Sequence, residues 1–484
     1  MKDLALRALD AASRSGVTYA DVRAIETRDR DVTTRNGKAG NVSSSESQGI
    51  GIRALASGCW GFAATSDLTK DGIQRAASLA IEIARSGVAA KKADVSLAPE
   101  ASYQATWVSP CAIDPFSIPV DRNLAALLAV DAELRRNPAI SLAETAMRFV
   151  RQRQVFASTP GSLIDQTRTT SGAGFSALCY KNGEIQKRSF PNSVGGQHQL
   201  KGYELVGGLD LLRHAPRIAE EAVELHSAPQ CPEGEFDLIL DSSQLGLQIH
   251  ESIGHPIELD RVLGSEANYA GMSFLTLDQL HHLRYGSEIV NVVCDARLEH
   301  GPGLGTFAFD DEGVPAQSTD IIRAGQFTGY MTSRETAAAV GQARSNGCMR
   351  AEGWARLPLI RMTNVSLLAG EQSLDEVMGA GHAIYMETNR SWSIDDKRYH
   401  FQFGCEIAWE MRNGKRIRML KNPSYSGIST EFWNACAAIA GPQHWTLWGV
   451  PNCGKGQPEQ VMGTGHGASP ARFHRIKIGS AYAA

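Results

Sequence analysis

The segment His250-Glu-Ser-Ile-Gly-His255 carries two imidazoles and a carboxylate that could act together on one metal ion. Imidazole nitrogen is a common zinc ligand, and a glutamate beside a ligand can accept a proton during hydrolysis. The spacing is one residue longer than the His-Glu-x-x-His pattern typical of zinc peptidases. His250, Glu251 and His255 are therefore the first candidates for a catalytic site, provided that the backbone can bring the two imidazoles together.

The longer spacing requires a distortion of the helix. Residues five apart on a regular α-helix point about 140° apart, because each residue turns the helix by about 100°. A single π-type turn would bring the two imidazoles to within about 50° of each other. Gly254 loosens the helix, and Pro256 lacks an amide hydrogen and disfavours α geometry at His255. We therefore expect the helix to bulge or end here, so that His255 turns toward His250.

A third ligand would distinguish a metal site from a simple surface pair of Glu251 and His255 at i, i+4 spacing. Cys453 is the best candidate, because it lies in a polar, glycine-rich loop where Lys455 could lower the pKa of its thiol. Sulfur and imidazole together suit Zn²⁺. Cys348 is the reserve candidate, whereas most other cysteines lie in apolar or strand-like contexts typical of a core.

The elements that must position these residues follow from the spacing of apolar side chains. Residues 236–241 form an apolar run that predicts a strand, and Leu245, Ile249 and Ile253 then recur at helical spacing. Ser242 or Ser243 could cap this helix. The sequence therefore places the two histidines on a helix that directly follows a strand.

The rest of the chain predicts an α+β protein in three segments. Residues 1–119 mix strands with a helix and are expected to form an N-terminal α/β domain of sheet and helix. Residues 120–232 are expected to form a middle domain, with a helix at 121–136, antiparallel strands at 140–189 and a helix starting near Pro216, able to pack with the first domain. Proline-rich stretches separate these segments. Residues 233–484 are expected to form a β-rich C-terminal metallopeptidase domain that carries the metal site on a distorted helix.

Composition excludes several classes of protein. The 484 residues include 48 Lys and Arg against 52 Asp and Glu, so no overall charge favours binding to nucleic acid or to an anionic membrane. The nine cysteines are an odd number without paired spacing, which favours reduced thiols over a disulfide framework. No uncharged apolar run approaches the roughly 18 residues that a membrane span needs. We therefore expect a soluble, cytoplasmic protein.

Further motifs surround the histidines in a recognisable order. The first motif continues as Pro256-Ile-Glu-Leu-Asp260, and Phe309-Asp-Asp-Glu-Gly-Val-Pro315, Arg361-Met-Thr-Asn364 and Asn452-Cys-Gly-Lys-Gly-Gln457 follow it. Gly49-Ile-Gly-Ile-Arg53 and Gly58-Cys-Trp-Gly-Phe62 stand near the front. Together they resemble the TldD/PmbA family of gyrase modulators and peptide-maturation proteases. The intact histidine motif is similar to the TldD branch, because the PmbA (TldE) branch lacks it.

The resemblance implies a zinc-dependent peptidase in which His250, His255 and Cys453 bind Zn²⁺ and Glu251 is the general base. It also implies that a metal-activated water hydrolyses the peptide bonds of unfolded or extended peptides. Dimers are implied as well, either homodimers or heterodimers with a PmbA-type subunit. Glu258 and Asp260 are possible acceptors for the imidazole N–H groups, or else solvated surface acids.

Two other functions remain open at this point. The chain could be a non-catalytic peptide-binding or scaffold subunit of a TldD/PmbA-type complex, although the intact Glu251 argues against this. It could also be a Cys-dependent hydrolase in which a histidine such as His466 activates Cys453. That second alternative leaves the histidine motif unexplained.

Overall fold

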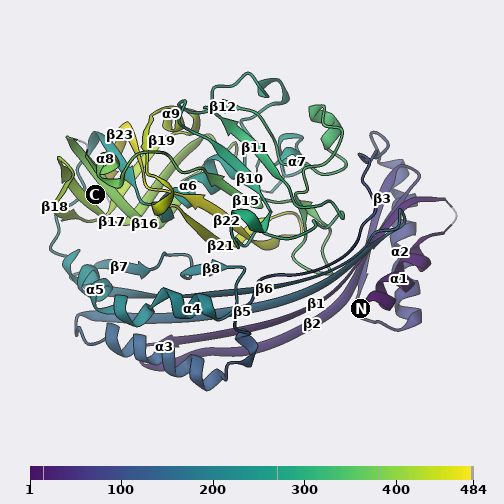
Figure 1. Cartoon of the computed structure of the whole chain (residues 1–484), viewed down its shortest axis with the longest axis horizontal. Helices are drawn as coiled ribbons and strands as arrows, with labels where there is room; N and C mark the ends of the chain where they lie inside the picture. The colour runs from purple at the N-terminus through teal and green to yellow at the C-terminus, as the bar shows by residue number, and fades with distance from the viewer. Residues whose placement is uncertain (15, 270, 380, 481–484) are drawn as a thin grey trace.

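The computed structural model of this chain describes residues 1–14, 16–269, 271–379 and 381–480. A long, curved N-terminal sheet forms one layer, and the β-rich C-terminal region lies on its concave face (Figure 1). The α+β fold with a β-rich C-terminal region is as expected from the sequence. None of the helices in the described residues is long and apolar enough to cross a membrane.

The N-terminal sheet has the order β3-β2-β1-β5-β6-β4, with β7 and β8 also paired to β6. Its neighbours are antiparallel except for β4 and β6, which run parallel. Asn36 and Gly37, both at positive φ, form the hairpin turn between β1 and β2. The strands are β1 (Val17–Arg35), β2 (Lys38–Ala56), β3 (Cys59–Thr65), β4 (Gln104–Val108), β5 (Ile140–Ser158), β6 (Leu163–Lys181), β7 (Glu184–Phe190) and β8 (Gln197–Gln199).

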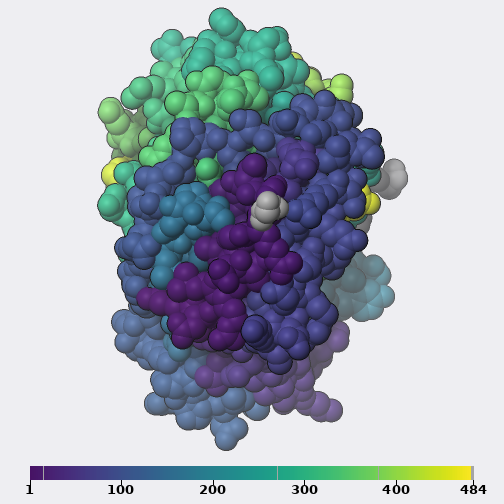
Figure 2. All heavy atoms as spheres, turned by 90° about the vertical axis from the view of Figure 1, so that its right-hand side faces the viewer, coloured from purple at the N-terminus to yellow at the C-terminus, as the bar shows by residue number. Residues whose placement is uncertain are grey.

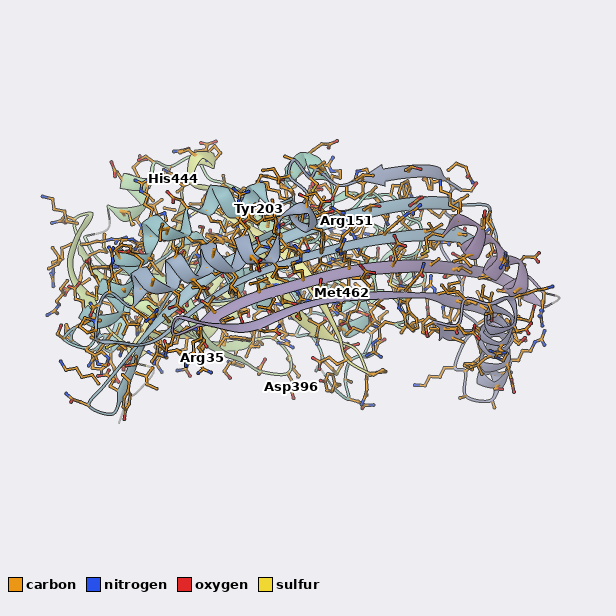
Figure 3. The ribbon with its side chains drawn as sticks, turned by 90° about the horizontal axis from the view of Figure 1, so that it is seen from below. Arg35, Arg151, Tyr203, Asp396, His444 and Met462 are labelled. Carbon is orange, nitrogen blue, oxygen red and sulfur yellow. The ribbon has the colours of Figure 1, made fainter. Side chains whose placement is uncertain are left out.

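Four of these strands, β1, β2, β5 and β6, have 19 residues each. At a rise of about 3.3 Å per residue they span roughly 60 Å, and Figure 3 shows them running along the molecule from below. Because β5 pairs with β1 over most of its length, one sheet contains strands from both sides of residue 119. The segments expected at 1–119 and 120–232 therefore share this sheet.

Helices cover the two ends of the sheet's convex face. At one end α1 (Lys2–Ala12) and α2 (Lys70–Ser86) pack on β1, β2 and β3, and Figure 2 shows this end of the molecule. Thr69 caps α2 by accepting a hydrogen bond from the Gly72 amide. A Cβ at Gly61 would lie 1.8 Å from the Ala80 carbonyl oxygen, so glycine is needed for this close approach of helix and strand.

At the other end α3 (Val120–Leu134), α4 (Glu204–Leu209) and α5 (Leu211–Glu224) pack on the sheet. The prediction of a helix beginning at Pro216 was wrong. The helix begins at Leu211, so Pro216 lies inside it, and the apolar stripe of Leu211, Ala215 and Ile218 extends it toward the N-terminus.

The C-terminal region contains two main sheets. The first has the order β16-β9-β23-β19-β17-β18, with β20 on β23, and an additional pairing of β16 with β17 closes five strands into a ring. Its strands are β9 (Gly234–Leu240), β16 (His382–Ile394), β17 (His400–Arg412), β18 (Lys415–Leu420), β19 (Pro423–Ile428), β20 (Cys436–Ile439) and β23 (Ala471–Ser480).

The second main sheet has the order β12-β11-β10-β15-β22-β21. Its strands are β10 (Val292–Asp295), β11 (Ser318–Arg323), β12 (Gln326–Phe327), β15 (Asn364–Leu367), β21 (Thr446–Lys455) and β22 (Gln460–Ala468), and β13 (Met349–Arg350) pairs separately with β14 (Leu359–Ile360). The helices are α6 (Ser242–Ile249), α7 (Leu259–Val262), α8 (Leu374–Met378) and α9 (Ser429–Asn434). Residues Ala337–Val340 form a short 3₁₀ turn.

Buried ion pairs join the two layers. Arg53 of β2 forms a bidentate contact with Asp21 and also reaches Glu312 of the C-terminal region at 3.5 Å. Arg188 of β7 lies 3.3 Å from Glu406 of β17. Both arginines are almost fully buried, so these contacts fix the N-terminal sheet against the region that carries the histidine motif.

Candidate metal centre

The two histidines of the motif flank a π-helical turn. Helix α6 follows β9, and the Asp241 carboxylate caps it by accepting from the Ser243 and Gln244 amides, in place of the serine cap that we expected. The turn at His250–Gly254 is π-helical, and the His255 amide donates to the His250 carbonyl at 3.1 Å. The distortion predicted from the motif spacing is therefore confirmed.

Gly254 makes this turn possible by packing tightly against a neighbouring strand connection. A Cβ at Gly254 would lie 2.1 Å from the Met362 sulfur. The apolar residues of the preceding strand and of α6, including Leu238, Leu245 and Ile249, are fully buried in the core. The element that carries the histidines is therefore closely packed in the core.

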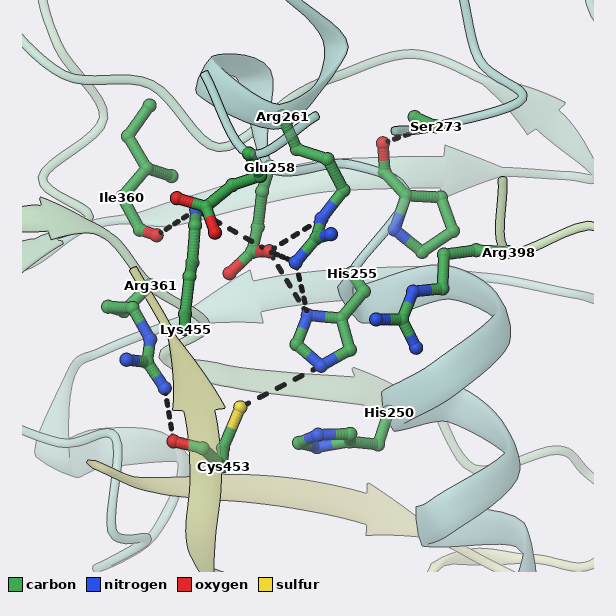
Figure 4. A network of polar contacts seen from close by, with 12 residues as sticks. His250, His255, Glu258, Arg261, Ser273, Ile360, Arg361, Arg398, Cys453 and Lys455 are labelled. Atoms are coloured by element: carbon green, nitrogen blue, oxygen red, sulfur yellow. Dashed lines mark hydrogen bonds and ion pairs between the residues drawn. The ribbon is translucent and has the colours of Figure 1, made fainter. Parts of the chain in front are cut away.

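Strand β21 brings Cys453 to the same point from nearly 200 residues away (Figure 4). The pairing of β21 with β22 is interrupted between Val450 and Cys453. The Cys453 sulfur lies 3.8 Å from His255 Nε2, and the potential ligand atoms of His250, His255 and Cys453 all lie within 4.8 Å of one another. All three residues are 3–4% exposed. Two imidazoles and a thiol at this separation fit a zinc ion that retains one open position.

The surroundings of His250 assign the proton of its ring. His466 Nδ1 lies 3.0 Å from the Val365 carbonyl, which can only accept, so this nitrogen carries a hydrogen. Burial and the neighbouring His250 lower the pKa of His466 well below its usual value, so the ring is neutral and its Nε2 accepts. His250 Nδ1 lies 2.8 Å from that atom and must donate to it. The free lone pair of His250 is therefore on Nε2, the atom available to a metal.

Charged groups around His255 also leave the free lone pair of its ring on Nε2. His255 Nδ1 donates to Glu258 Oε2 at 3.0 Å, which leaves the lone pair on Nε2, facing Cys453. Burial alone would raise the pKa of Glu258, but Lys455, His255 and Arg261 lower it well below its usual value. Arg261 donates to the same carboxylate oxygen at 3.2 Å, and Lys455 Nζ lies 3.5 Å from it. The Glu258 carboxylate is therefore ionised and holds the second imidazole.

Asp260 lies one step further from the imidazoles than we expected. Its carboxylate accepts from Lys455 Nζ at 2.7 and 2.9 Å and from the Arg261 amide, and it contacts neither His250 nor His255. Asp260 thus acts on Lys455, which in turn lies beside Glu258.

The groups that act on the thiol also differ from those predicted. Burial would raise the pKa of Cys453, but His255 and Arg361 outweigh it and the net shift is downward, which favours the thiolate. Arg361 is fully buried and also donates to the Cys453 carbonyl oxygen. Lys455, to which the sequence assigned this effect, is engaged with Asp260 instead.

Glu251 lies beside the candidate ligands and is 5% exposed. Arg398, which comes from the connection between β16 and β17, donates to Glu251 Oε2 at 2.8 Å. This bond fixes the position of the carboxylate. Sequence reasoning missed Arg398, because nothing in the local sequence relates it to a motif about 150 residues earlier.

His466 and Cys348 have roles other than those considered from sequence. His466 contacts His250, and the histidine beside Cys453 is His255, so the Cys453 and His466 pairing of the thiol-hydrolase alternative is not formed. Cys348 lies 4.0 Å from Cys294 in the core and is not part of the group formed by His250, His255 and Cys453. Thr464 and His466 are two residues apart on β22, so their side chains lie on the same face of that strand. The local sequence carries no signal that relates His466 to His250.

Comparison with known proteins gives two family matches. The PmbA/TldA metallopeptidase C-terminal domain matches residues 233–480, and the PmbA/TldA metallopeptidase domain 1 matches residues 20–84. A metalloprotease from Methanothermobacter thermautotrophicus is 27% identical over 466 residues, covering 96% of each chain. A metalloprotease TldD homolog from Haemophilus influenzae is 24% identical, covering 98% of this chain and 95% of its own.

The fold is shared with solved structures as well. The structure of TldE from Thermococcus kodakarensis matches with a TM-score of 0.71 and 14% identity, covering 99% of each chain. At this identity the likeness concerns the arrangement of the elements, including the long sheet and the region that lies on it.

Proposed function

Because this chain belongs to the PmbA/TldA (TldD/PmbA) metallopeptidase family, we propose that it is a zinc-dependent peptidase whose metal ligands are His250, His255 and Cys453. The observation that carries the proposal is the π-helical turn, which brings both imidazoles to the thiol of a distant strand. Each imidazole donates from Nδ1 to an acceptor, so both Nε2 atoms are free to bind. A surface pair of Glu251 and His255 would need neither this burial nor these supports.

Zinc held at this site would act as a Lewis acid on the peptide carbonyl and would lower the pKa of water. Glu251 is placed to accept the proton from water and to deliver it to the leaving amine. Arg398 keeps the Glu251 carboxylate oriented during this transfer. Glu258 and His466 hold the imidazole rings in the tautomer that the ligands require.

The proposed substrates are unfolded or extended peptides, because the candidate ligands are buried and a folded chain could not reach them. The proposed assembly is a homodimer or a heterodimer with a PmbA-type subunit, and the support for it is the family resemblance. These two points are independent of the ligand set.

The substitution Glu251→Gln tests the proposal. We expect the variant to retain zinc at the wild-type level and to lose cleavage of an unfolded-peptide library by about 10²-fold or more, because the amide cannot accept the proton. Zinc is measured by elemental analysis of protein purified without chelators. Glu235→Gln, which changes an exposed acid on β9, is the matched control and should cleave normally. Cleavage that persists in protein free of metal would refute the zinc mechanism.

A further inference from the structure

A cleft of about 730 Å³ lies between the N-terminal sheet and the C-terminal region. One wall is formed by strands β1, β5 and β6, and the other by residues 350–356 and by β21 and β22. This volume lies within the range of about 300–1,000 Å³ typical of ligand pockets. Met462, which lines the cleft, lies near the middle of the long strands in Figure 3.

The wall on the C-terminal side is continuous with the candidate metal centre. Met462 pairs with Cys453 across the two strands, and Pro451 of the same strand lines the cleft. Thr464, two residues beyond Met462, lies 3.4 Å from His250 Nδ1. A peptide in the cleft would therefore lie along the strands that carry one candidate ligand and contact another.

The charge of the cleft is unbalanced. Four arginines line it, against two carboxylates, Asp29 and Glu352. Asp29 already pairs with one of the arginines, Arg148, at 3.2 Å. The remaining cations are Arg168, Arg350 and Arg356, and among the described residues no carboxylate lies within ion-pair distance of any of them. The charge of Asp311 acts on Arg168 and Arg350, but this carboxylate forms its ion pair with Arg23 instead. His198, which also lines the cleft, has a pKa lowered to about 4 by burial and is neutral.

Arg350 is the buried member of this group, at 3% exposed. Its two terminal nitrogens donate to the carbonyls of Met362 and Leu304, whereas Nε has no partner. Burial and the charges of Arg168 and Arg361 lower its pKa to about 9, although the charges of Asp311 and Cys453 act in the opposite direction, so the guanidinium stays protonated near neutral pH. A buried cation without a carboxylate in ion-pair contact is costly, and an anion bound in the cleft would reduce that cost.

We propose that this cleft binds a carboxylate of the peptide substrate, with Arg168 as the residue that determines specificity and Arg350 and Arg356 contributing charge. Arg168 lines the cleft, donates one bond to the Gln152 side chain and has no carboxylate in ion-pair contact among the described residues. The carboxylate comes either from an acidic side chain or from the free C-terminus of the peptide. The proposal rests on the proposed peptidase function for the identity of the ligand.

Binding is measured first, on the Glu251→Gln protein, by fluorescence anisotropy with labelled unstructured hexapeptides. One pair of peptides differs only by Glu against Gln at an internal position, with both C-termini amidated. A second pair has no acidic side chain and differs only by a free or amidated C-terminus. We expect the anionic member of at least one pair to bind about tenfold more tightly at low salt, since charge-assisted bonds are the stronger ones. The pair that shows the difference identifies the source of the carboxylate.

The same pairs are then measured with variants of Arg168. Arg168→Met should reduce the preference to about twofold or less, and Arg168→Lys should retain more of it than Arg168→Met does, because the positive charge is kept. Arg323→Gln removes an exposed arginine on β11 and should leave the preference unchanged. If Arg168→Met fails to fold, Arg356→Gln together with the salt dependence of binding in the parent protein takes its place, and a preference that neither change reduces would overturn the proposal.

Cleavage by the wild-type protein separates this proposal from the proposed function. Cleavage of both members of each pair at equal rates, with equal binding, would refute the carboxylate site and leave the peptidase intact. A binding preference that depends on Arg168, in a protein that cleaves no peptide, would refute the peptidase and leave the carboxylate site intact. Equal binding of both members of both pairs overturns the carboxylate site whatever the cleavage result.

Discussion

The long strands of the N-terminal sheet run for 19 residues with few interruptions, whereas the candidate ligands lie where regular structure breaks. His250 and His255 flank a π-helical turn, and Cys453 follows a change of register between β21 and β22. Regular pairing spaces side chains evenly and alternates them between the two faces of a sheet. The two regions therefore contribute differently: the C-terminal region contains the candidate metal ligands, and the N-terminal sheet forms one wall of the cleft.

The largest effect is expected from the loss of a candidate metal ligand in the C-terminal region. Cys453→Ser should lose most of its bound zinc and its cleavage activity, because a neutral hydroxyl is a poor substitute for a thiolate ligand. Zinc per chain is measured by elemental analysis alongside cleavage. Cys348→Ser, a buried cysteine outside the candidate centre, should keep its zinc. Full zinc content in Cys453→Ser would remove this residue from the ligand set.

The support of His255 gives the next largest effect. Glu258→Ala should lower the free energy of unfolding by about 3–5 kcal/mol, because it removes the carboxylate that the buried Arg261 contacts, whereas Lys455 keeps Asp260. Urea unfolding measures the change. Glu235→Ala, which breaks an exposed pair with Arg475, should cost no more than about 1 kcal/mol. Similar losses in the two variants would mean that the Glu258 network is not a buried support.

His198, which lines the cleft from β8 of the N-terminal sheet, gives a test that depends on pH. The folded pKa of His198 is lowered to about 4, mainly by burial, whereas the unfolded chain has a value of about 6.5. Its contribution to stability is therefore complete above about pH 6.5 and is lost as the pH falls toward 4. At pH 5 the loss should be about 2 kcal/mol.

The measurement compares wild type and His198→Gln by urea unfolding at pH 7 and pH 5. The decrease in stability between the two pH values should be smaller in the variant by about 2 kcal/mol. Zinc content at pH 7 should be the same in both proteins, because His198 belongs to the N-terminal wall. An unchanged pH dependence would show that this ring is not buried in its neutral form.

The smallest effect tests whether the N-terminal region is separable from the chemistry. Thr69→Ala removes the cap of α2 and should lower stability by about 1 kcal/mol. Thermal unfolding measures this loss. Zinc content and cleavage at low temperature should match wild type, and a fall in zinc content would contradict the division between the two regions.

The sequence predicted the local distortions of the site better than its long-range contacts. The spacing of His250 and His255, with Gly254 and Pro256, was enough to predict the π-type turn, because helical geometry depends only on near neighbours. Cys453 was selected by its polar, glycine-rich context and by resemblance. Its closeness to His255 in the structure agrees with that choice, whereas metal binding itself stays a prediction.

Other features depend on partners far apart in the chain. The pairing of β5 with β1 joins residues more than 100 positions apart, so proline-rich stretches alone could not show that one sheet spans residue 119. The contact of Arg398 with Glu251 and that of His466 with His250 have no local signature either. Asp260 was considered as a partner of an imidazole, but its carboxylate binds Lys455, a residue far along the chain that the fold brings beside it.

The hydrogen-bond chain from His250 through His466 ends on the main-chain carbonyl of Val365. Every residue type has that carbonyl, so substitutions at position 365 that preserve β15 leave the acceptor in place. The orientation of the His250 lone pair therefore depends on one side chain, His466, whose own tautomer is set by a backbone acceptor. The orientation of His255 likewise depends on one side chain, Glu258, whose carboxylate Arg261 and Lys455 keep ionised. Each imidazole of the candidate centre thus relies on a single supporting side chain, so a substitution at either His466 or Glu258 should disturb the ligand set.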